Sequence, residues 1–319
     1  MELFDLWAGQ YQLDSQIFGA ITLANQRLSE AAAVMDEATE SQVPGGVDGA
    51  VVRWRDEPGV AGFWGFGLWL PKRGGPPQPT AFVDQALAPV EGRPVATDEE
   101  TVSRMRALGM TFDPMSIGLW MVGRGSPTPQ HCAPGQTVTV PGRSATLGCR
   151  VTLSNGRVAI STAGHGARTT NLIADVAGTR IGRVAHSVCP QTQTPGTPCA
   201  DIALIALDRN HQEGAHRAFQ AYQATSAGDD LLVNVPAGTQ QAWARAVLPT
   251  LWLNRTCGAW ANVIETDHHV SVQGDSGSTV EVGTTVGHPT GHVVAGDAVR
   301  TVIQDLDYQL GWFNAAIRP

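Results

Sequence analysis

The chain has 319 residues, of which 42% are apolar and 16% are charged, and its formal net charge is −8. This apolar fraction is enough to form a hydrophobic core, which excludes a wholly disordered chain. The acidic balance excludes a nucleic-acid-binding protein that relies on a broadly basic surface. The length predicts about two domains, and the 36 glycines and 20 prolines are typical of short strands joined by turns.

The N-terminal sequence MELFDLWAGQYQLD begins acidic and lacks the basic and then apolar regions of a secretory signal. No apolar run reaches the ~18 residues that a membrane span needs, so we expect a cytoplasmic protein that does not bind membranes. The five cysteines are an odd number, which favours free thiols. Cys189 and Cys199 flank a turn-rich loop. We interpret them as two buried thiols, with a disulfide between them as the alternative.

A long helix is predicted over residues 14–42, started by Asp14 or Ser15 and ended by Pro44. Apolar residues recur there at spacings of three and four, which is the pattern of one helix face. These residues are Ile17, Ile21, Ala24, Leu28, Ala31 and Met35. We expect the stripe to dock on the rest of the chain, and a coiled-coil seam that joins two copies is the alternative.

The segment that follows mixes strand and helix signals. Residues 49–71 are rich in β-branched and aromatic residues and predict strands. Residues 80–88 predict one short helix, and residues 97–100 open another that ends at Gly109. We interpret residues 1–112 as an N-terminal module, made of a long helix and a small α/β unit.

From residue 117 the pattern becomes all-β, in two blocks of short strands separated by turn residues. The two blocks predict two barrels, barrel one over about 117–215 and barrel two over about 225–300, and residues 269–272 are among the expected strands. A final helix is predicted over about 300–311, because Val302, Leu306 and Leu310 fall on one helical face. The fold class is therefore mainly β, with residues 113–319 forming one double-barrel domain.

Three segments of the all-β half carry residues with catalytic potential. His165 lies in STAGHG, Asp201 precedes the apolar run IALIAL, and Ser276 lies in QGDSGS. A serine hydroxyl is a poor nucleophile unless an imidazole takes its proton and a carboxylate orients that imidazole. The oxyanion that forms needs N–H donors, and the amides of Gly274 and Ser276 are suited to supply them, because glycine lets the backbone turn inward.

In their order along the chain and in their local sequence, these segments resemble the chymotrypsin/trypsin-like serine peptidases. TAGHG resembles the T-A-A-H-C signature of that family, ADIALI resembles its D-I-A-L segment, and GDSGS resembles its G-D-S-G-G signature. The resemblance covers residues 117 to about 310, and residues 145–165 also resemble the first-barrel hairpin of bacterial and plant intracellular members. It implies a trypsin-like double β-barrel and a serine endopeptidase in which His165 is the base, Asp201 the orienting acid and Ser276 the nucleophile.

The sequence departs from the family at several places. Gly166 replaces a cysteine, so the disulfide beside the histidine cannot form, and Ser278 replaces the last glycine of G-D-S-G-G. No I-V-G-G activation sequence precedes barrel one. In many members the counterpart of Asp275 pairs with a newly cut N-terminal amine. We therefore expect the oxyanion loop to form without such a cut, or under the control of the N-terminal module.

The resemblance places the base of the specificity pocket at Val270 and another wall on residues 291–296, including Val294. Small or apolar residues there imply cleavage after a small or apolar residue. The alternative is an acidic preference, set by His268, His269 and His292.

No spacing typical of a metal site or a phosphate loop is present, so we expect no metal and no cofactor. The expected partners are a protein or peptide substrate, and a regulator or second copy bound through the N-terminal module. The alternative function is a catalytically silent trypsin-like domain that acts as a binding or scaffold protein. An all-β interaction protein, in which the motifs are accidental, and an ester hydrolase are weaker alternatives.

Overall fold

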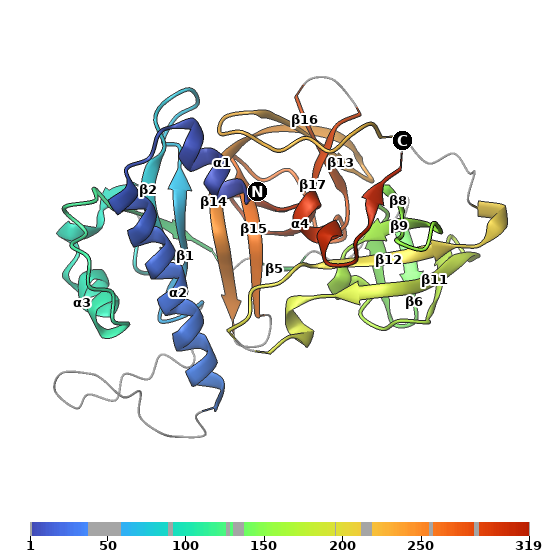
Figure 1. The fold of residues 1–319 in the computed structure, drawn as a ribbon, viewed down its shortest axis with the longest axis horizontal. Coiled ribbons are helices and arrows are strands. Elements are labelled where there is room, and N and C mark those ends of the chain that lie inside the picture. Colours follow the sequence, from blue (N-terminus) through green and yellow to red (C-terminus); the bar gives the residue numbers. More distant parts are fainter. Residues whose placement is uncertain are drawn as a thin grey trace.

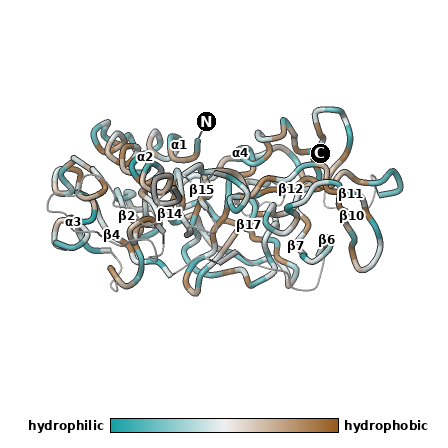
Figure 2. The backbone as a smooth tube through the Cα atoms, turned by 90° about the horizontal axis from the view of Figure 1, so that it is seen from below, coloured by the Kyte–Doolittle hydropathy of each residue, from teal (hydrophilic) through white to brown (hydrophobic). Residues whose placement is uncertain are grey.

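The structure is a computed structural model. It describes residues 2–37, 59–88, 92–125, 128–129, 137–194, 196–211, 219–254, 258–283 and 287–318. The N-terminal helices lie at one end, barrel two in the middle and barrel one at the other end (Figure 1). Helices α1, α2 and α4 run along one side of the molecule (Figure 2). No helix in the described part of the chain has the length and apolar character of a membrane span.

The N-terminal helices cover one face of the module's sheet. Helix α1 spans Leu3–Gln10 and α2 spans Ser15–Glu37. The carboxylate of Asp14 accepts a hydrogen bond from the N–H of Gln16, which satisfies a free donor at the start of α2. Ile21 and Leu28 are buried in the large core cluster with strand residues. The apolar stripe therefore docks on the chain itself; residues 38–42 of the predicted helix lie outside the described residues.

Four strands belong to the N-terminal part of the sheet. They are β1 (Phe63–Trp69), β2 (Gln78–Asp84), β3 (Arg93–Pro94) and β4 (Trp120–Arg124). Strand β2 corrects the short helix predicted over residues 80–88. It pairs antiparallel with β1 and parallel with β4, and Ala81, Phe82 and Val83 are buried. Ala81 and Val83 on one face of β2 and Phe82 on the other pack into two different core clusters, so both faces are covered and the apolar run shows no alternation.

The helix predicted after residue 97 is confirmed. A 3-10 turn, η1 (Val95–Thr97), leads into α3 (Glu99–Ala107). The carboxylate of Asp98 caps α3 by accepting from the N–H of Thr101 at 2.8 Å. Gly109 follows the helix with a φ of 76°, a conformation that glycine adopts without strain.

Barrel two closes through its longest strand. Its order is β13-β16-β17-β18-β15-β14, and β14 pairs back with β13 to complete the ring. Strand β14 also pairs with β1, so the sheet of the N-terminal module continues directly from barrel two. The division at residue 112 stays a prediction, because β4 lies beyond it and pairs with β2 and β3. The barrel strands are β13 (Asp230–Val235), β14 (Gly238–Asn254), β15 (Gly258–Thr266), β16 (Thr279–Val282), β17 (Pro289–Gly296) and β18 (Thr301–Asp305).

Barrel one closes through a bent strand. Its order is β8-β9-β12-β11-β10-β6-β7, and only residues 147–149 separate β7 from β8. Gly148 N–H donates to Ser161 O, and Ser161 N–H donates to Cys149 O, so pairing with β9 begins before β8. The two ends of the sheet are thus one bent strand. The strands are β6 (Thr137–Val140), β7 (Arg143–Thr146), β8 (Arg150–Thr152), β9 (Val158–Thr162), β10 (Ile173–Val176), β11 (Thr179–Val188) and β12 (Ile202–Leu207), and β19 (Ala316–Ile317) pairs with β8 from outside.

The two closed barrels, the C-terminal helix and the N-terminal module confirm the predicted mainly-β fold. Besides the helix over residues 80–88, two further local predictions are wrong. The final helix, α4, spans only Leu306–Gly311, because residues 301–305 form β18 between β15 and β17. Residues 269–272 form no strand. The N–H groups of Val270 and Val272 donate to the side chains of Thr301 and Asp275 instead of to a neighbouring strand.

Candidate active site

The paired ends of β9 and β12 bring His165 and Asp201 together. His165 lies in a 3-10 turn, η2 (Gly164–Gly166), just after β9, and Asp201 directly precedes β12. His165 Nδ1 lies 2.6 Å from Asp201 Oδ2, and the His165 N–H donates to Asp201 Oδ1 at 2.7 Å. The two bonds fix both the ring and the main chain of His165 on one carboxylate. Only 2% of His165 and 1% of Asp201 is exposed.

Glycine is required in this turn. A Cβ on Gly164 would lie 1.9 Å from the carbonyl oxygen of Val188, so no other residue fits against β11. The TAGH segment therefore has a packing reason as well as a chemical one: Gly164 lets the turn approach the barrel closely enough for His165 to reach Asp201.

Ser276 comes from barrel two and lies against barrel one. Its carbonyl accepts from the N–H of Thr146 at 2.9 Å. A Cβ on Gly277 would lie 2.9 Å from the nitrogen of Ala163, two residues before His165. The serine loop and the histidine turn are thus in contact. The Ser276 hydroxyl donates to Val294 O at 3.3 Å, rather than to His165.

The loop before Ser276 presents main-chain donors. Gly274 has a φ of 118°, and its carbonyl accepts from Thr146 Oγ1 at 2.8 Å. Among the residues that the structure describes, no acceptor receives the N–H of Gly274 or of Ser276. Two amides without a partner on one tight loop are suited to hold an oxyanion.

Asp275 is held by the loop itself. Its carboxylate accepts from the N–H of Val272 at 2.7 Å, and its own N–H donates to Val272 O at 3.1 Å. Burial raises the pKa of Asp275, and the bond from Val272 opposes that rise. Within the described ranges no arginine or lysine forms an ion pair with this carboxylate.

The residues predicted to shape the pocket differ in their surroundings. Val294 is fully buried and offers its carbonyl to Ser276, whereas Val270 is half-buried beside Thr301. His292 points into barrel one, where its Nε2 lies 3.0 Å from Ser161 Oγ. His268 lies beside Asp267 instead. Their part in substrate binding stays a prediction.

Three residues that sequence reasoning missed contact Asp201. They are Trp260, Gln304 and Gln309. All three are buried in or next to barrel two, and no local motif marks them.

Cys149, Cys189 and Cys199 are buried free thiols, and Cys132 and Cys257 lie outside the described residues. Over the described ranges, no group of three or more His, Cys, Asp or Glu side chains is placed to hold a metal ion.

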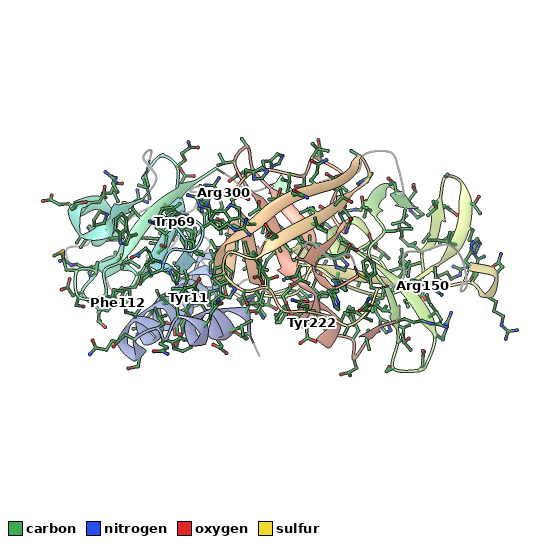
Figure 3. All side chains as sticks on the ribbon, turned by 90° about the horizontal axis from the view of Figure 1, so that it is seen from above. Tyr11, Trp69, Phe112, Arg150, Tyr222 and Arg300 are labelled. Atoms are coloured by element: carbon green, nitrogen blue, oxygen red, sulfur yellow. The ribbon has the colours of Figure 1, made fainter. Side chains whose placement is uncertain are left out.

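The molecule is elongated, with Phe112 in the N-terminal module, Tyr222 near the middle and Arg150 in barrel one (Figure 3).

No protein-family model and no curated protein matches the sequence. Solved structures of serine proteases are similar in fold. A Nocardiopsis protease is 19% identical over 58% of this chain and 97% of its own, with a TM-score of 0.46. A chymotrypsin from Cellulomonas bogoriensis is 20% identical over 58% of this chain and 96% of its own, with a TM-score of 0.43. Thermobifida fusca protease A is 16% identical over 57% of this chain and 96% of its own, with a TM-score of 0.45.

Proposed function

We propose that the chain, which has the double-barrel fold of the chymotrypsin/trypsin-like serine peptidases, is a serine endopeptidase. The observation that carries the proposal is the buried pair of His165 and Asp201 at 2.6 Å, on a turn that contacts the loop of Ser276. A neutral imidazole whose Nδ1–H is held by a carboxylate presents Nε2 as a base.

In the proposed reaction Ser276 Oγ attacks the carbonyl carbon of the peptide bond, and its proton passes to His165 Nε2. The N–H groups of Gly274 and Ser276 hold the oxyanion of the tetrahedral intermediate. His165 then gives the proton to the leaving amine, and an ester to Ser276 remains. A water molecule attacks this ester in the same way, which releases the acid and restores Ser276. The hydroxyl must first rotate from Val294 O toward His165, a change of one side-chain torsion.

The bond from Ser276 to Val294 also favours a second candidate, a catalytically silent domain that binds a protein or acts as a scaffold. Hydrolysis of an unstructured protein substrate separates the two. The wild type should cleave it, and Ser276→Ala, His165→Ala and Asp201→Asn should each lower the rate by at least about a thousandfold. A wild-type rate equal to that of Ser276→Ala would support the silent domain.

For specificity we favour a small or apolar residue before the cut bond, because Val270 and Val294 carry no charge for a longer side chain. An acidic preference set by His268 or His269 is the alternative. A peptide library resolves the choice: enrichment of Ala, Val or Leu at this position supports the first reading. Enrichment of Asp or Glu supports the second, and enrichment of Arg or Lys contradicts both.

Access to the site is controlled by the chain itself. Strand β5 (Thr128–Pro129) pairs antiparallel with β17, with Thr128 opposite Gly296 and Pro129 opposite Ala295. From Thr128 to Pro129 the chain therefore runs toward Val294 and the Ser276 hydroxyl. An extended substrate would add to the same strand edge, so β5 competes with it. Ser276 is 0% exposed, which also requires part of the chain to move before a substrate reaches it.

Replacing residues 126–130 with glycine and serine tests this control. The KM for a peptide substrate should fall several-fold, since a competing strand has been removed, while kcat stays within about twofold. An unchanged KM in an active protein would contradict control by β5 and leave the endopeptidase assignment intact.

A further inference from the structure

We propose that Trp260 is a positioning residue, whose indole N–H holds and partly neutralises the carboxylate of Asp201. The proposal rests on the proposed function, in which Asp201 orients His165. It assigns to barrel two a direct part in setting the charge of a carboxylate that belongs to barrel one.

The Asp201 side chain has no exposed surface, so each of its oxygens depends on donors from the protein. Oδ1 accepts from the N–H of His165 at 2.7 Å. Oδ2 accepts from His165 Nδ1 at 2.6 Å and from Trp260 Nε1 at 3.3 Å. The imidazole and the indole therefore share one oxygen. Among the described residues, Trp260 is the one side chain of barrel two that donates a hydrogen bond to the Asp201 carboxylate.

The backbone around Trp260 fixes this contact. Trp260 lies in β15, and Cys199 forms a bridge beside it. Cys199 N–H donates to Ala259 O at 3.1 Å, and Ala261 N–H donates to Cys199 O at 3.2 Å. The residues just before Asp201 thus run alongside β15. Trp260 is 1% exposed and belongs to the same apolar cluster as Val294, whose carbonyl accepts from Ser276.

Gln304 and Gln309 hold a different part of Asp201. Gln304 Oε1 accepts from the Asp201 N–H at 2.7 Å, and Gln309 Nε2 donates to the Asp201 carbonyl at 3.1 Å. These bonds fix the main chain. Trp260 touches the ionised group itself, so its removal should change both the position of the carboxylate and its charge density.

The sign of the charge effect follows from the shared oxygen. An N–H donor draws negative charge from the carboxylate, which weakens the attraction between Asp201 and protonated His165. Without the indole N–H the attraction between Asp201 and protonated His165 is stronger, so the acid limb of the pH-rate profile should move to higher pH. A residue that acts only through packing would not move this acid limb.

The test compares Trp260→Phe with Trp252→Phe. Trp252 lies on the neighbouring strand β14 and is 4% exposed, and its Nε1 has no hydrogen-bond partner among the residues that the structure describes. Both variants remove an indole from a buried site, and one of them removes a bond to Asp201. For Trp260→Phe we expect kcat to fall about tenfold or more, as the loss of a hydrogen bond to a charged group implies. KM should change little, and the acid limb of the pH profile should move to higher pH.

Trp252→Phe should leave kcat and the acid limb close to the wild type. Equal kcat and equal acid limbs in the two variants would overturn the proposal. Should Trp260→Phe not fold, a benzothiophene analogue of tryptophan at position 260 keeps the shape and replaces N–H by sulfur. NMR titration of His165 provides a readout without activity. The wild type could prove inactive while the substitution at Trp260 still shifts the NMR titration of His165 to higher pH. That result would refute the endopeptidase assignment and support the positioning role.

Discussion

Arg124 and Glu265 form a buried ion pair between β4, in the N-terminal part of the larger sheet, and β15 of barrel two. Arg124 Nη2 lies 2.6 Å from Glu265 Oε2, and the two side chains are 5% and 2% exposed. Arg124 also stacks its guanidinium over the ring of Phe82, with 5.1 Å to the ring centroid. The pair links β4 to β15, the strand that also carries Trp260.

Removing one partner of this pair should be costly. Arg124→Met leaves a buried carboxylate without its cation, and we expect the free energy of unfolding to fall by about 3 kcal/mol or more. The double variant Arg124→Met with Glu265→Leu should recover most of that loss, because no uncompensated charge remains. Urea unfolding of the single and double variants measures both values. A fall of less than about 1 kcal/mol in the free energy of unfolding of Arg124→Met would contradict this prediction, because the ion pair would then contribute little to stability.

Gln304 should be essential for stability although its side chain is uncharged. It is fully buried, accepts from the Asp201 N–H, and donates to the carbonyls of Cys199 and Ala261. Gln304→Leu keeps the approximate shape but removes the acceptor of the Asp201 N–H and one donor to each of the two carbonyls, so unfolding should become easier by about 2 to 4 kcal/mol. Gln240→Leu, at an exposed position of β14, is the matched control and should have little effect on chemical unfolding.

His292 should make stability depend on pH. Burial lowers the pKa of His292 to about 4, from 6.5 in an exposed site. Between these values the unfolded chain binds a proton that the folded chain does not, so stability falls as the pH falls from 6.5 to 4. Asp305 works in the opposite direction, because burial raises its pKa to about 6 and the folded chain keeps its proton longer.

Because the two groups oppose each other, the wild-type curve alone does not isolate His292. The informative quantity is the difference in unfolding free energy between the wild type and His292→Asn. We expect the advantage of the wild type to shrink by about 3 kcal/mol between pH 7 and pH 4, measured by denaturant unfolding at each pH. A constant difference would show that His292 does not titrate as a buried imidazole.

Gly148 should tolerate no side chain, because it packs between the two barrels. A Cβ there would lie 2.5 Å from His292 Nε2 and 2.6 Å from Ser161 Oγ. Gly148→Ala should therefore separate these two groups and lower thermal stability, at a cost of about 1 to 3 kcal/mol. Gly19→Ala is the counterpart: outside the local helix backbone, no atom of the described residues lies within 4 Å of a carbon added at this exposed position of α2, and the change should raise stability by about 0.5 to 1 kcal/mol. Calorimetry measures the melting temperature of each variant. Shifts in the same direction for Gly148→Ala and Gly19→Ala would contradict the prediction.

Much of the fold was readable from local patterns. The cap at Asp98 and the stop at Gly109 predict α3, and alternation with turn residues predicts most barrel strands. The His165–Asp201 pair follows from segments that resemble a family, and the structure places the two side chains in contact. These features depend on residues that are close in sequence or that carry a known motif.

The errors come from contacts that local sequence does not encode. Residues 80–84 have no strand alternation because both faces of β2 are covered. Residues 301–305 continue a helical pattern into α4, yet pairing on both sides makes them a strand. From the sequence, Trp260 is predicted to be an ordinary core residue. Its hydrogen bond to Asp201 crosses from one barrel to the other, so no local pattern indicates it. The direction of the Ser276 hydroxyl is likewise set by β17, not by the GDSGS segment.

The central claim is that Ser276 is a nucleophile activated by His165. The most direct measurement is labelling with a fluorophosphonate, followed by mass spectrometry of the modified peptide. We predict a single adduct on Ser276, whose formation is abolished in Ser276→Ala and strongly slowed in His165→Ala. Labelling of the wild type at the same rate as His165→Ala, or with no adduct on Ser276, would contradict the account.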